Sequence, residues 1–363
     1  MKKILFKSIF AIALIFGTAA CTGDFQEINT NPNSPTSVSS ALLLPRIQRD
    51  VINTVLGEAW GIGNIVIQHT AKNQFVNEDR YLWGEINSIW NRVYNDMRDV
   101  NNIIRQSETL GQNNYKGIAL VMKAWMFSLV TDCYGDVPYT EAGRGKEGFV
   151  YPKYDTQESI YNGILNDLKT ANEILGSTGE VVQGDLIYNG DIQKWRRLAN
   201  SLRVRYLMRI SRKRNVAADL QSIIGDSKNP LFTGNGDNAV YTFLPNAPDQ
   251  FPLFTTRIGS FNEFRASTTA VNALKALNDN RLFVFFRPTP ATEEGANPVY
   301  EGILNGLAMR KRCNTMADHK TTRVSVSCSL KNPLHRKAFR WQEVLLCTMP
   351  NFSSCWQKRL KKA

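Results

Sequence analysis

The sequence predicts a mainly α-helical fold, built from helical hairpins with long irregular loops. Between Ala41 and Leu282, apolar residues recur at three- and four-residue spacing, in stretches bounded by glycine, proline and asparagine. Strand-like alternation of apolar and polar residues is scarce in the same region. Helix pairs of this length joined by short turns are typical of a stack related to tetratricopeptide repeats, although the repeat consensus itself is not legible.

Several predicted helices begin at a capping signal. Asp155 and Thr156, for example, precede Glu158 and Ser159, so a side-chain oxygen can accept hydrogen bonds from free backbone amides. The predicted helices are 40–56, 62–71, 83–110, 113–133, 156–175, 191–212, 217–224 and 267–277. Two irregular stretches, 134–153 and 230–265, are too long to be simple connections. A helical scaffold usually carries its functional residues on such loops.

The N-terminus has the layout of an exported lipoprotein. Three lysines precede an apolar run, 9–16, that ends in small residues. This run is far shorter than the roughly 20 residues of a transmembrane helix. We expect a signal peptide, 1–20, followed by a lipidated linker, 21–40, with Cys21 as the acylated residue. Thr18 departs from the leucine usual in a lipobox, and an ordinary secretory signal with a chance cysteine is the alternative.

The amino-acid composition of the chain changes near residue 308. The formal net charge is +12, but thirteen lysines and arginines follow residue 307, against Asp318 and Glu343 alone. The preceding residues are therefore nearly neutral, which does not suit a nucleic-acid-binding body. The tail also holds Cys313, Cys328, Cys347 and Cys355. Their spacing does not match that of zinc ligands, and no metal site is predicted.

Out-of-frame translation accounts better for this tail. One permitted set of codons for residues 352–363, when read from its third base, encodes Gln-Phe-Leu-Leu-Ala-Glu-Ala-Ala-Glu-Lys-Gly. That peptide has the pattern of an amphipathic helix. We therefore predict a frameshift within 307–311, an incomplete helical domain over 41–307, and a tail, 308–363, without a defined fold. A gene sequence without a shift near codon 308 would contradict this interpretation.

Four motifs follow one another in a recognisable order. They are Asp-Phe-Gln-Glu-Ile-Asn-Thr-Asn-Pro-Asn at 24–33, Thr-Asp-Cys-Tyr-Gly-Asp-Val-Pro-Tyr-Thr-Glu-Ala at 131–142, Tyr-Pro-Lys-Tyr-Asp-Thr-Gln-Glu-Ser-Ile-Tyr at 151–161, and Gly-Asp-Leu-Ile-Tyr-Asn-Gly-Asp at 184–191. The last leads into Trp195 and an Asn-Ser-Leu-Arg run at 200–203. Together the motifs resemble the SusD/RagB family of nutrient-binding outer-membrane lipoproteins, over roughly residues 20–307. The C-terminal part that family members carry is missing beyond this region.

The motif at 131–142 resembles the family signature, and we expect it to be structural. Gly135 and Pro138 would turn the chain at a helix end, while Asp132 and Asp136 would bond local backbone amides. The signature residues are Asp132, Tyr134, Gly135, Asp136, Val137, Pro138 and Tyr139.

The resemblance implies a non-catalytic lipoprotein at the cell surface, anchored in the outer membrane. It implies binding of oligosaccharides or peptides and their delivery to a TonB-dependent SusC-like transporter, without a cofactor. Sugar sites combine aromatic faces with amide and carboxylate groups. One short stretch supplies both and is the predicted ligand-binding site: Asn73, Gln74, Phe75, Asn77, Asp79, Tyr81 and Trp83. Packing of one helical hairpin on the next is the alternative role for each of them.

Two other classes of function are open at this point. A glycan-degrading enzyme would need a carboxylate pair, and carboxylates are plentiful. No HExxH, GxSxG or GxxxxGK motif occurs, however, and no catalytic residue is predicted. Residues 143–148 fit GxGxxG but lack the preceding strand and following helix of a dinucleotide site. A purely structural envelope lipoprotein would bind no soluble ligand.

Overall fold

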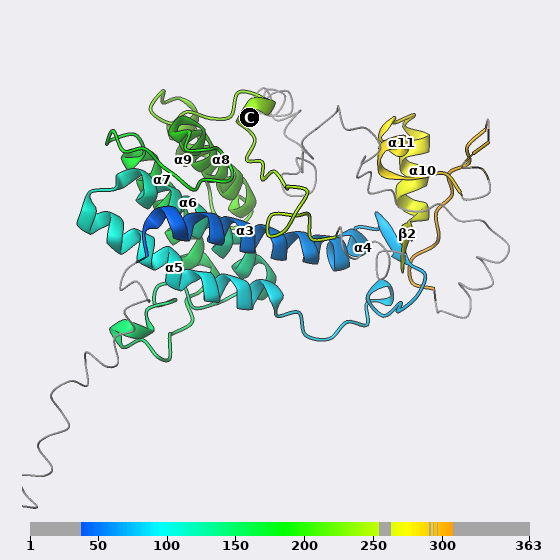
Figure 1. Cartoon of the computed structure of the whole chain (residues 1–363), viewed down its shortest axis with the longest axis horizontal. Coiled ribbons are helices and arrows are strands. Elements are labelled where there is room, and N and C mark those ends of the chain that lie inside the picture. Colours follow the sequence, from blue (N-terminus) through cyan, green and yellow to red (C-terminus); the bar gives the residue numbers. More distant parts are fainter. Residues whose placement is uncertain (1–37, 254–262, 290–291, 293, 296, 308–363) are drawn as a thin grey trace, which may run out of the picture. The chain divides into compact units, whose positions relative to one another are not determined.

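The computed structural model describes residues 38–253, 263–289, 292, 294–295 and 297–307. The predicted signal peptide, Cys21, nearly all of the linker, and the tail from 308 lie outside these residues. The chain divides between Ser39 and Ser40, and the following description concerns the unit that begins at Ser40. Its described residues are mainly α-helical, as the sequence predicts (Figure 1).

The elements follow one another as a series of long helices interrupted by loops. The helices are α3 (Ser40–Glu58), α4 (Asn64–Val66), α5 (Ser88–Leu110), α6 (Asn113–Tyr134), α7 (Gln157–Ile174), α8 (Ile192–Ile210), α9 (Ala217–Ile224), α10 (Thr268–Ala276) and α11 (Arg281–Phe285). A π-helical turn (Ala59–Gly63) and three 3-10 turns (Glu78–Arg80, Gly145–Glu147 and Asn235–Asp237) lie between them. Strands β1 (Thr70–Lys72) and β2 (Phe264–Ala266) form an antiparallel pair.

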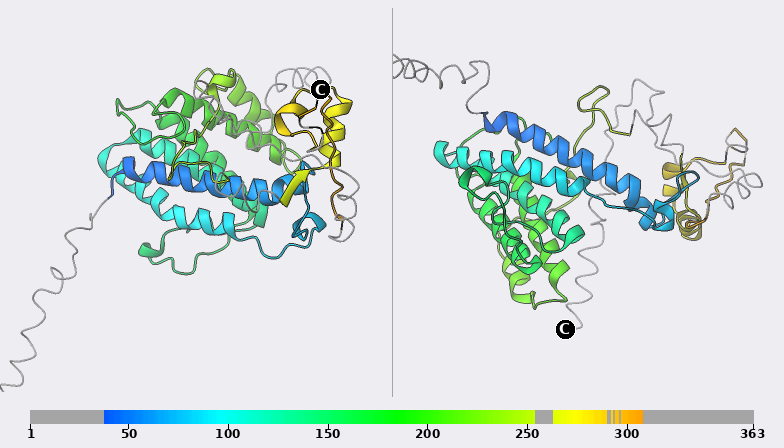
Figure 2. Two further views of the ribbon diagram at one scale, coloured as in Figure 1. Left: turned by 45° about the vertical axis from the view of Figure 1, so that its right-hand side comes forward. Right: turned by 90° about the horizontal axis from the view of Figure 1, so that it is seen from below.

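Long helices that neighbour each other in the chain pack as antiparallel hairpins. Helices α3 and α5 lie side by side (Figure 2). Ser40 at the start of α3 donates to Gln106 near the end of α5 over 3.0 Å. Arg92 in the first turns of α5 reaches back to Asp50 on α3 over 2.7 Å. Helix α6 then packs between α5 and α7, and α7 packs on α8, so the predicted hairpin stack is confirmed.

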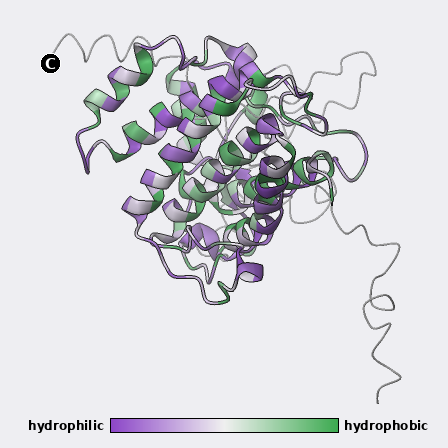
Figure 3. Ribbon diagram, turned by 90° about the vertical axis from the view of Figure 1, so that its left-hand side faces the viewer, coloured by the Kyte–Doolittle hydropathy of each residue, from purple (hydrophilic) through white to green (hydrophobic). Residues whose placement is uncertain are grey.

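The main hydrophobic core surrounds α6. Ile118, Met126 and Phe127 on this helix are fully buried, as is Trp195 on α8. By length and composition alone α6 could also cross a membrane, but 67% of its most apolar window is buried inside the protein. A buried core helix passes the same test. Hydrophobic and hydrophilic residues alternate along the other long helices, which keep one face for the core (Figure 3).

Two predicted helices differ from the structure. The segment predicted as 62–71 is instead a π-helical turn, the short α4 and then strand β1, because Gln68 adopts a left-handed conformation with φ 55°. The helix predicted from residue 83 begins at Ser88. Its N-cap, Asn87, makes no capping hydrogen bond, so no local signal marked the start.

Candidate functional site

Three aromatic side chains of one short stretch are exposed, and we call them the aromatic patch: Phe75, Tyr81 and Trp83. Their exposed fractions are 67%, 51% and 38%. The rings of Tyr81 and Trp83 contact edge to face, with their centroids 5.3 Å apart. Such contacts hold the two rings in a defined arrangement while leaving apolar surface in water. Core packing, the alternative role for these three residues, is therefore not what the structure shows.

Amide side chains accompany the aromatic patch. Gln74 and Asn77 are exposed, and neither makes a side-chain hydrogen bond within the described part of the chain. The Oδ1 atom of Asn73 is buried and has no hydrogen-bond partner there either. A buried acceptor without a partner is costly. The two exposed amides, Gln74 and Asn77, therefore offer donors and acceptors that a polyhydroxylated ligand could satisfy, whereas the buried Oδ1 atom of Asn73 is out of reach of such a ligand.

Lys72 anchors the segment that carries the patch. This lysine is only 8% exposed, yet its charge is compensated. Its Nζ lies 3.1 Å from Glu78 and 3.6 Å from Glu263, and 5.3 Å from the ring centroid of Phe264. Lys72 also pairs with Phe264 in the β1–β2 register. The strand pair thus ties the patch to a segment nearly two hundred residues further along the chain.

Asp79 anchors the same segment from its other end, which corrects part of the ligand-site prediction. Its carboxylate is fully buried, and it accepts hydrogen bonds from Asn305 Nδ2 at 2.6 Å and from the Gly306 amide at 3.2 Å. The same Asn305 Nδ2 lies 2.9 Å from the Thr70 carbonyl oxygen. Asp79 therefore faces the scaffold, and the structure does not bring it to the surface with the patch.

Arg80 and Leu82 lie in the same stretch and are also exposed, and neither was predicted as a site residue. Arg80 is exposed and makes no side-chain hydrogen bond or ion pair in the described residues. Leu82 is 55% exposed beside Tyr81 and Trp83. The only signal in the sequence was their position between residues already selected for their chemistry.

The aspartates of the signature bond neighbouring helices, which corrects the expectation that both would bond local backbone amides. Asp132, near the end of α6, accepts from the Tyr161 hydroxyl at 2.7 Å and pairs with Arg209 at 2.7 Å. Burial, and then this hydrogen bond, raise the pKa of the Tyr161 phenol, which keeps it protonated as a donor. Asp136 accepts from the backbone amide of Gln157 at 2.8 Å, and so caps α7 from outside that helix.

The remaining signature residues shape the loop between α6 and α7. Gly135 ends α6 with φ 79°, a conformation that favours glycine. Val137 is fully buried and forms a backbone bridge with Asp155. The Pro138 carbonyl accepts from Tyr94 at 2.7 Å, whereas the hydroxyls of Tyr134 and Tyr139 donate to Ile86 O and Asp167. These contacts support the structural role that we expected for the signature.

Two features that could mark an enzyme site, a metal centre and a dinucleotide-binding loop, are absent from the described residues. No group of three histidine, cysteine, aspartate or glutamate side chains there could hold a metal ion. The GxGxxG run lies in a loop whose regular structure is the 3-10 turn Gly145–Glu147. No strand leads into it, so this part of the chain lacks the strand-turn-helix context of a dinucleotide site.

The fold is a scaffold of helical hairpins related to tetratricopeptide repeats, with exposed aromatic side chains on one of its loops. The chain belongs to the SusD-like family described as starch-binding and associating with the outer membrane, whose model matches residues 32–346. Carbohydrate binding at the outer membrane is the common property of this family. No curated protein sequence matches the chain.

Solved structures show the same fold. A SusD homologue from Bacteroides fragilis is 24% identical with a TM-score of 0.67, and the match covers 80% of this chain and 62% of that one. A chitin-binding protein is 27% identical with a TM-score of 0.66, covering 79% and 64%. A chitin-binding SusD homologue from Flavobacterium johnsoniae is 22% identical with a TM-score of 0.60, covering 78% and 59%. The chain therefore spans about three fifths of the length of these structures.

Proposed function

We propose that this protein binds nutrient oligosaccharides at the aromatic patch without cleaving them. The proposal also places it at the cell surface, held in the outer membrane by acylated Cys21, from where it delivers the ligand to a SusC-like TonB-dependent transporter. The family description supports carbohydrate binding at the outer membrane. The anchor, the surface location and the transporter are the finer parts of the proposal.

One observation carries the choice of site: the Tyr81–Trp83 ring pair is exposed and follows directly after Asp79, whose buried carboxylate holds the chain at that point. Exposed rings in fixed positions lose little conformational entropy when a ligand binds. Sugar rings present C–H faces that pack on aromatic faces, and their hydroxyls require donors and acceptors. Gln74, Asn77 and Arg80 are exposed in the same stretch of the chain and supply these groups.

Titration calorimetry on the chain without its predicted signal peptide tests the site. Starch-derived malto-oligosaccharides and chitin oligosaccharides are the ligands to use first. We expect Trp83→Ala to weaken binding of the ligand that binds by roughly tenfold, equivalent to about 1.4 kcal/mol. Tyr151→Ala is the matched control, because Tyr151 is 95% exposed and lies in the loop between α6 and α7. Equal affinities for the two variants would show that the patch is not the site.

Further measurements on the same samples distinguish a sugar-binding protein from an enzyme, a structural protein and a peptide-binding protein. Mass spectrometry of the oligosaccharides after incubation should show no shortened product, whereas a glycan-degrading enzyme would release one. A structural envelope protein would bind none of them, and neither would a protein whose ligands are peptides. Binding of a peptide library without sugar binding would therefore replace oligosaccharides with peptides as the ligand class.

The anchor and the transporter require tests in cells. We expect mass spectrometry to find acyl chains on Cys21 and the protein in the outer-membrane fraction. A Cys21→Ser variant should leave that fraction. Co-purification of a SusC-like transporter from solubilised outer membranes would support delivery, and its absence under mild detergent would count against that part of the proposal.

A further inference from the structure

Three arginine side chains make no hydrogen bond, ion pair or ring contact within the described residues: Arg80, Arg205 and Arg212. A guanidinium is best satisfied by a carboxylate, which it can bind through two parallel hydrogen bonds. Each of the three cations could therefore contact an acidic group of a ligand. Arg212 is exposed just beyond α8, whereas Arg205 lies in a hollow and Arg80 lies in the stretch of the aromatic patch.

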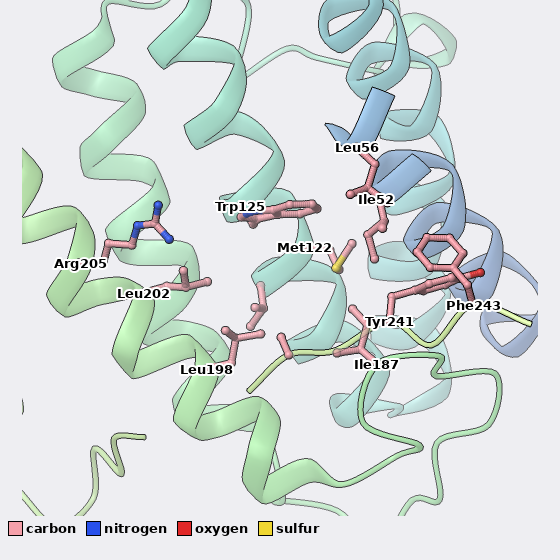
Figure 4. A pocket seen from close by; sticks show the side chains of 12 residues that line it. Ile52, Leu56, Met122, Trp125, Ile187, Leu198, Leu202, Arg205, Tyr241 and Phe243 are labelled. Atoms are coloured by element: carbon pink, nitrogen blue, oxygen red, sulfur yellow. The ribbon is translucent and has the colours of Figure 1, made fainter. Parts of the chain in front are cut away.

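The hollow that Arg205 lines is poorly suited to a sugar. It lies between helices α3, α6 and α8, and two loops complete its walls (Figure 4). Most of the side chains that line it are apolar, among them Trp125, Leu198 and Phe243. Its volume is about 80 Å³, whereas sites for small molecules usually enclose roughly 300–1,000 Å³. We therefore assign no oligosaccharide to the hollow.

Arg80 carries a charge that the neighbouring carboxylates leave uncompensated. Glu78 and Asp79 precede it directly, but both are engaged with other groups. Glu78 pairs with Lys72 over 3.1 Å, and Asp79 is fully buried. The next acidic residue, Glu85, accepts a hydrogen bond from an asparagine amide two residues further on. Arg80 is thus an exposed cation in a stretch whose first two carboxylates bind the scaffold.

The turn that ends at Arg80 is closed by hydrogen bonds and runs into the Tyr81–Trp83 ring pair. The Tyr81 amide donates to the Glu78 carbonyl oxygen at 3.0 Å. The Leu82 amide donates to the carbonyl oxygen of residue 77 at 2.8 Å, and this pair of bonds is typical of a closed helical end. Tyr81 itself is left-handed, with φ 58°. That conformation is unfavourable for a bulky side chain, and such residues cluster at binding sites.

The same turn brings an amide and the guanidinium to one side. Side chains three residues apart lie above one another in a 3-10 turn. Asn77 and Arg80 are three apart and both exposed, whereas Val76 and Asp79 are three apart and both buried. One side of the turn therefore holds the scaffold, and the other offers an amide and a cation to a ligand.

We propose that the ligand of the aromatic patch is an acidic oligosaccharide, in which a uronate carboxylate pairs with Arg80 while a sugar ring packs on Tyr81 or Trp83. This inference rests on the proposed function and narrows its ligand class. A neutral sugar could use the rings and the amides, but it would gain little from the cation. Hydrogen bonds between a guanidinium and a carboxylate are roughly twice as strong as neutral ones.

Titration calorimetry with galacturonate oligomers and their methyl esters tests the proposal on the chain without its predicted signal peptide. The two ligands share their sugar rings and differ in the charge of the carboxyl group at neutral pH. We expect the acid to bind about tenfold more tightly than the ester at low salt, and this advantage to shrink as salt screens the pair. Equal affinities for acid and ester would overturn the proposal. Tighter binding of a sulfated oligosaccharide than of the galacturonate oligomer would overturn the choice of a carboxylate.

An Arg80→Gln variant assigns the preference to one residue. We expect it to bind the acid about as weakly as the ester, and to bind the ester as the unmodified chain does. Arg212→Gln is the matched control, because Arg212 is also exposed and without a partner in the described residues, and its loss changes the net charge equally. This control should keep the preference for the acid. A preference that survives in Arg80→Gln would contradict the role of Arg80.

Trp83→Ala separates this inference from the proposed function. The variant should weaken the binding of acid and ester alike, because both use the rings. If it does so while the unmodified chain binds acid and ester equally, the patch binds sugars without regard to charge, and only the inference fails. If Trp83→Ala changes neither affinity, the patch is not the binding site, and the proposed function fails together with the inference.

Discussion

At the scale of single residues, Asp185 illustrates how one buried carboxylate organises several segments. It accepts from Gln48 Nε2 at 2.9 Å and from Trp195 Nε1 at 2.7 Å. Its two oxygens also accept from the backbone amides of Ile187, Tyr188 and Gly190. The sequence analysis placed Asp185 in a family motif and Trp195 after it. The link to Gln48 on α3 lies 137 positions away and left no local pattern.

We expect Asp185→Ala to lower the free energy of unfolding by about 3 kcal/mol or more. The substitution leaves the Trp195 and Gln48 donors buried without an acceptor, and each such group costs roughly 1–3 kcal/mol. Asp185→Asn should cost less, since the amide keeps one acceptor oxygen. Urea unfolding followed by circular dichroism measures both. The comparison is Asp191→Ala, which removes the N-cap hydrogen bond to the Lys194 amide of α8 and should cost about 1 kcal/mol. A smaller loss for Asp185→Ala than for Asp191→Ala would contradict this role.

At the scale of elements, side-chain caps mark several of the predicted helix starts, although α6 and α9 begin at their predicted first residues without such a cap. Helices α7, α8 and α10 begin within one residue of their predicted starts, and each has a side-chain cap, from Thr156, Asp191 and Ser267. The start of α5 was wrong by five residues where no such cap exists. Strands β1 and β2 have three residues each, and nearly two hundred residues of sequence separate them. Elements that depend on distant pairing leave little periodicity to detect.

Some residues of the candidate site could be predicted from the sequence and others could not. Phe75, Tyr81 and Trp83 could be selected because their chemistry is concentrated in one short stretch, and all three are exposed. Asp79 could not be assigned correctly, because its partner Asn305 lies 226 positions away. The hollow lined by Arg205 was not predicted at all, since its walls come from three helices and two loops. Local chemistry is legible in a sequence, whereas tertiary neighbours are not.

We expect Asp79→Ala to weaken ligand binding indirectly. Asp79 is buried and would not contact the ligand, but it holds the segment that carries the aromatic patch. The change removes the acceptor for Asn305 and Gly306, so residues 70–83 should open more readily. We expect faster amide hydrogen exchange in this segment and roughly tenfold weaker sugar binding. Asp79→Asn keeps one acceptor oxygen and should restore part of both. Unchanged exchange in Asp79→Ala would show that Lys72 and the strand pair suffice to hold the segment.

At the scale of the whole molecule, the hairpin architecture could be predicted because its long helices each carry their own period and turn signals. The polar contacts between the helices could not be predicted from the sequence. Buried carboxyl groups among them make the free energy of unfolding depend on pH. Asp96 on α5 is almost fully buried, and its Oδ2 has no hydrogen-bond partner in the described residues. Burial raises the pKa of this carboxyl to about 7, although nearby Arg92 opposes the rise.

The sign of this effect follows from proton linkage. In the unfolded chain Asp96 loses its proton near pH 4, whereas the folded protein keeps it to about pH 7. Between these values the folded state binds more protons, so the free energy of unfolding falls as pH rises. The contribution of Asp96 is therefore full below about pH 4 and lost above about pH 7.

We expect Asp96→Asn, which mimics the protonated carboxyl, to remove this dependence. Relative to the unmodified chain, the variant should gain on the order of 2 kcal/mol between pH 5 and pH 8, because the buried carboxyl of Asp96 becomes charged in the folded protein over this interval. Urea unfolding at both pH values measures the difference.

Asp249→Asn should change the free energy of unfolding with the opposite pH dependence. A hydrogen bond from Arg49 lowers the pKa of Asp249, so the stabilising contribution of Asp249 is lost only in acid. That variant should be weaker than the unmodified chain at pH 8 and approach it as pH falls below 4. Parallel pH profiles for Asp96→Asn and the unmodified chain would mean that Asp96 is ionised in the folded protein and compensated by Arg92.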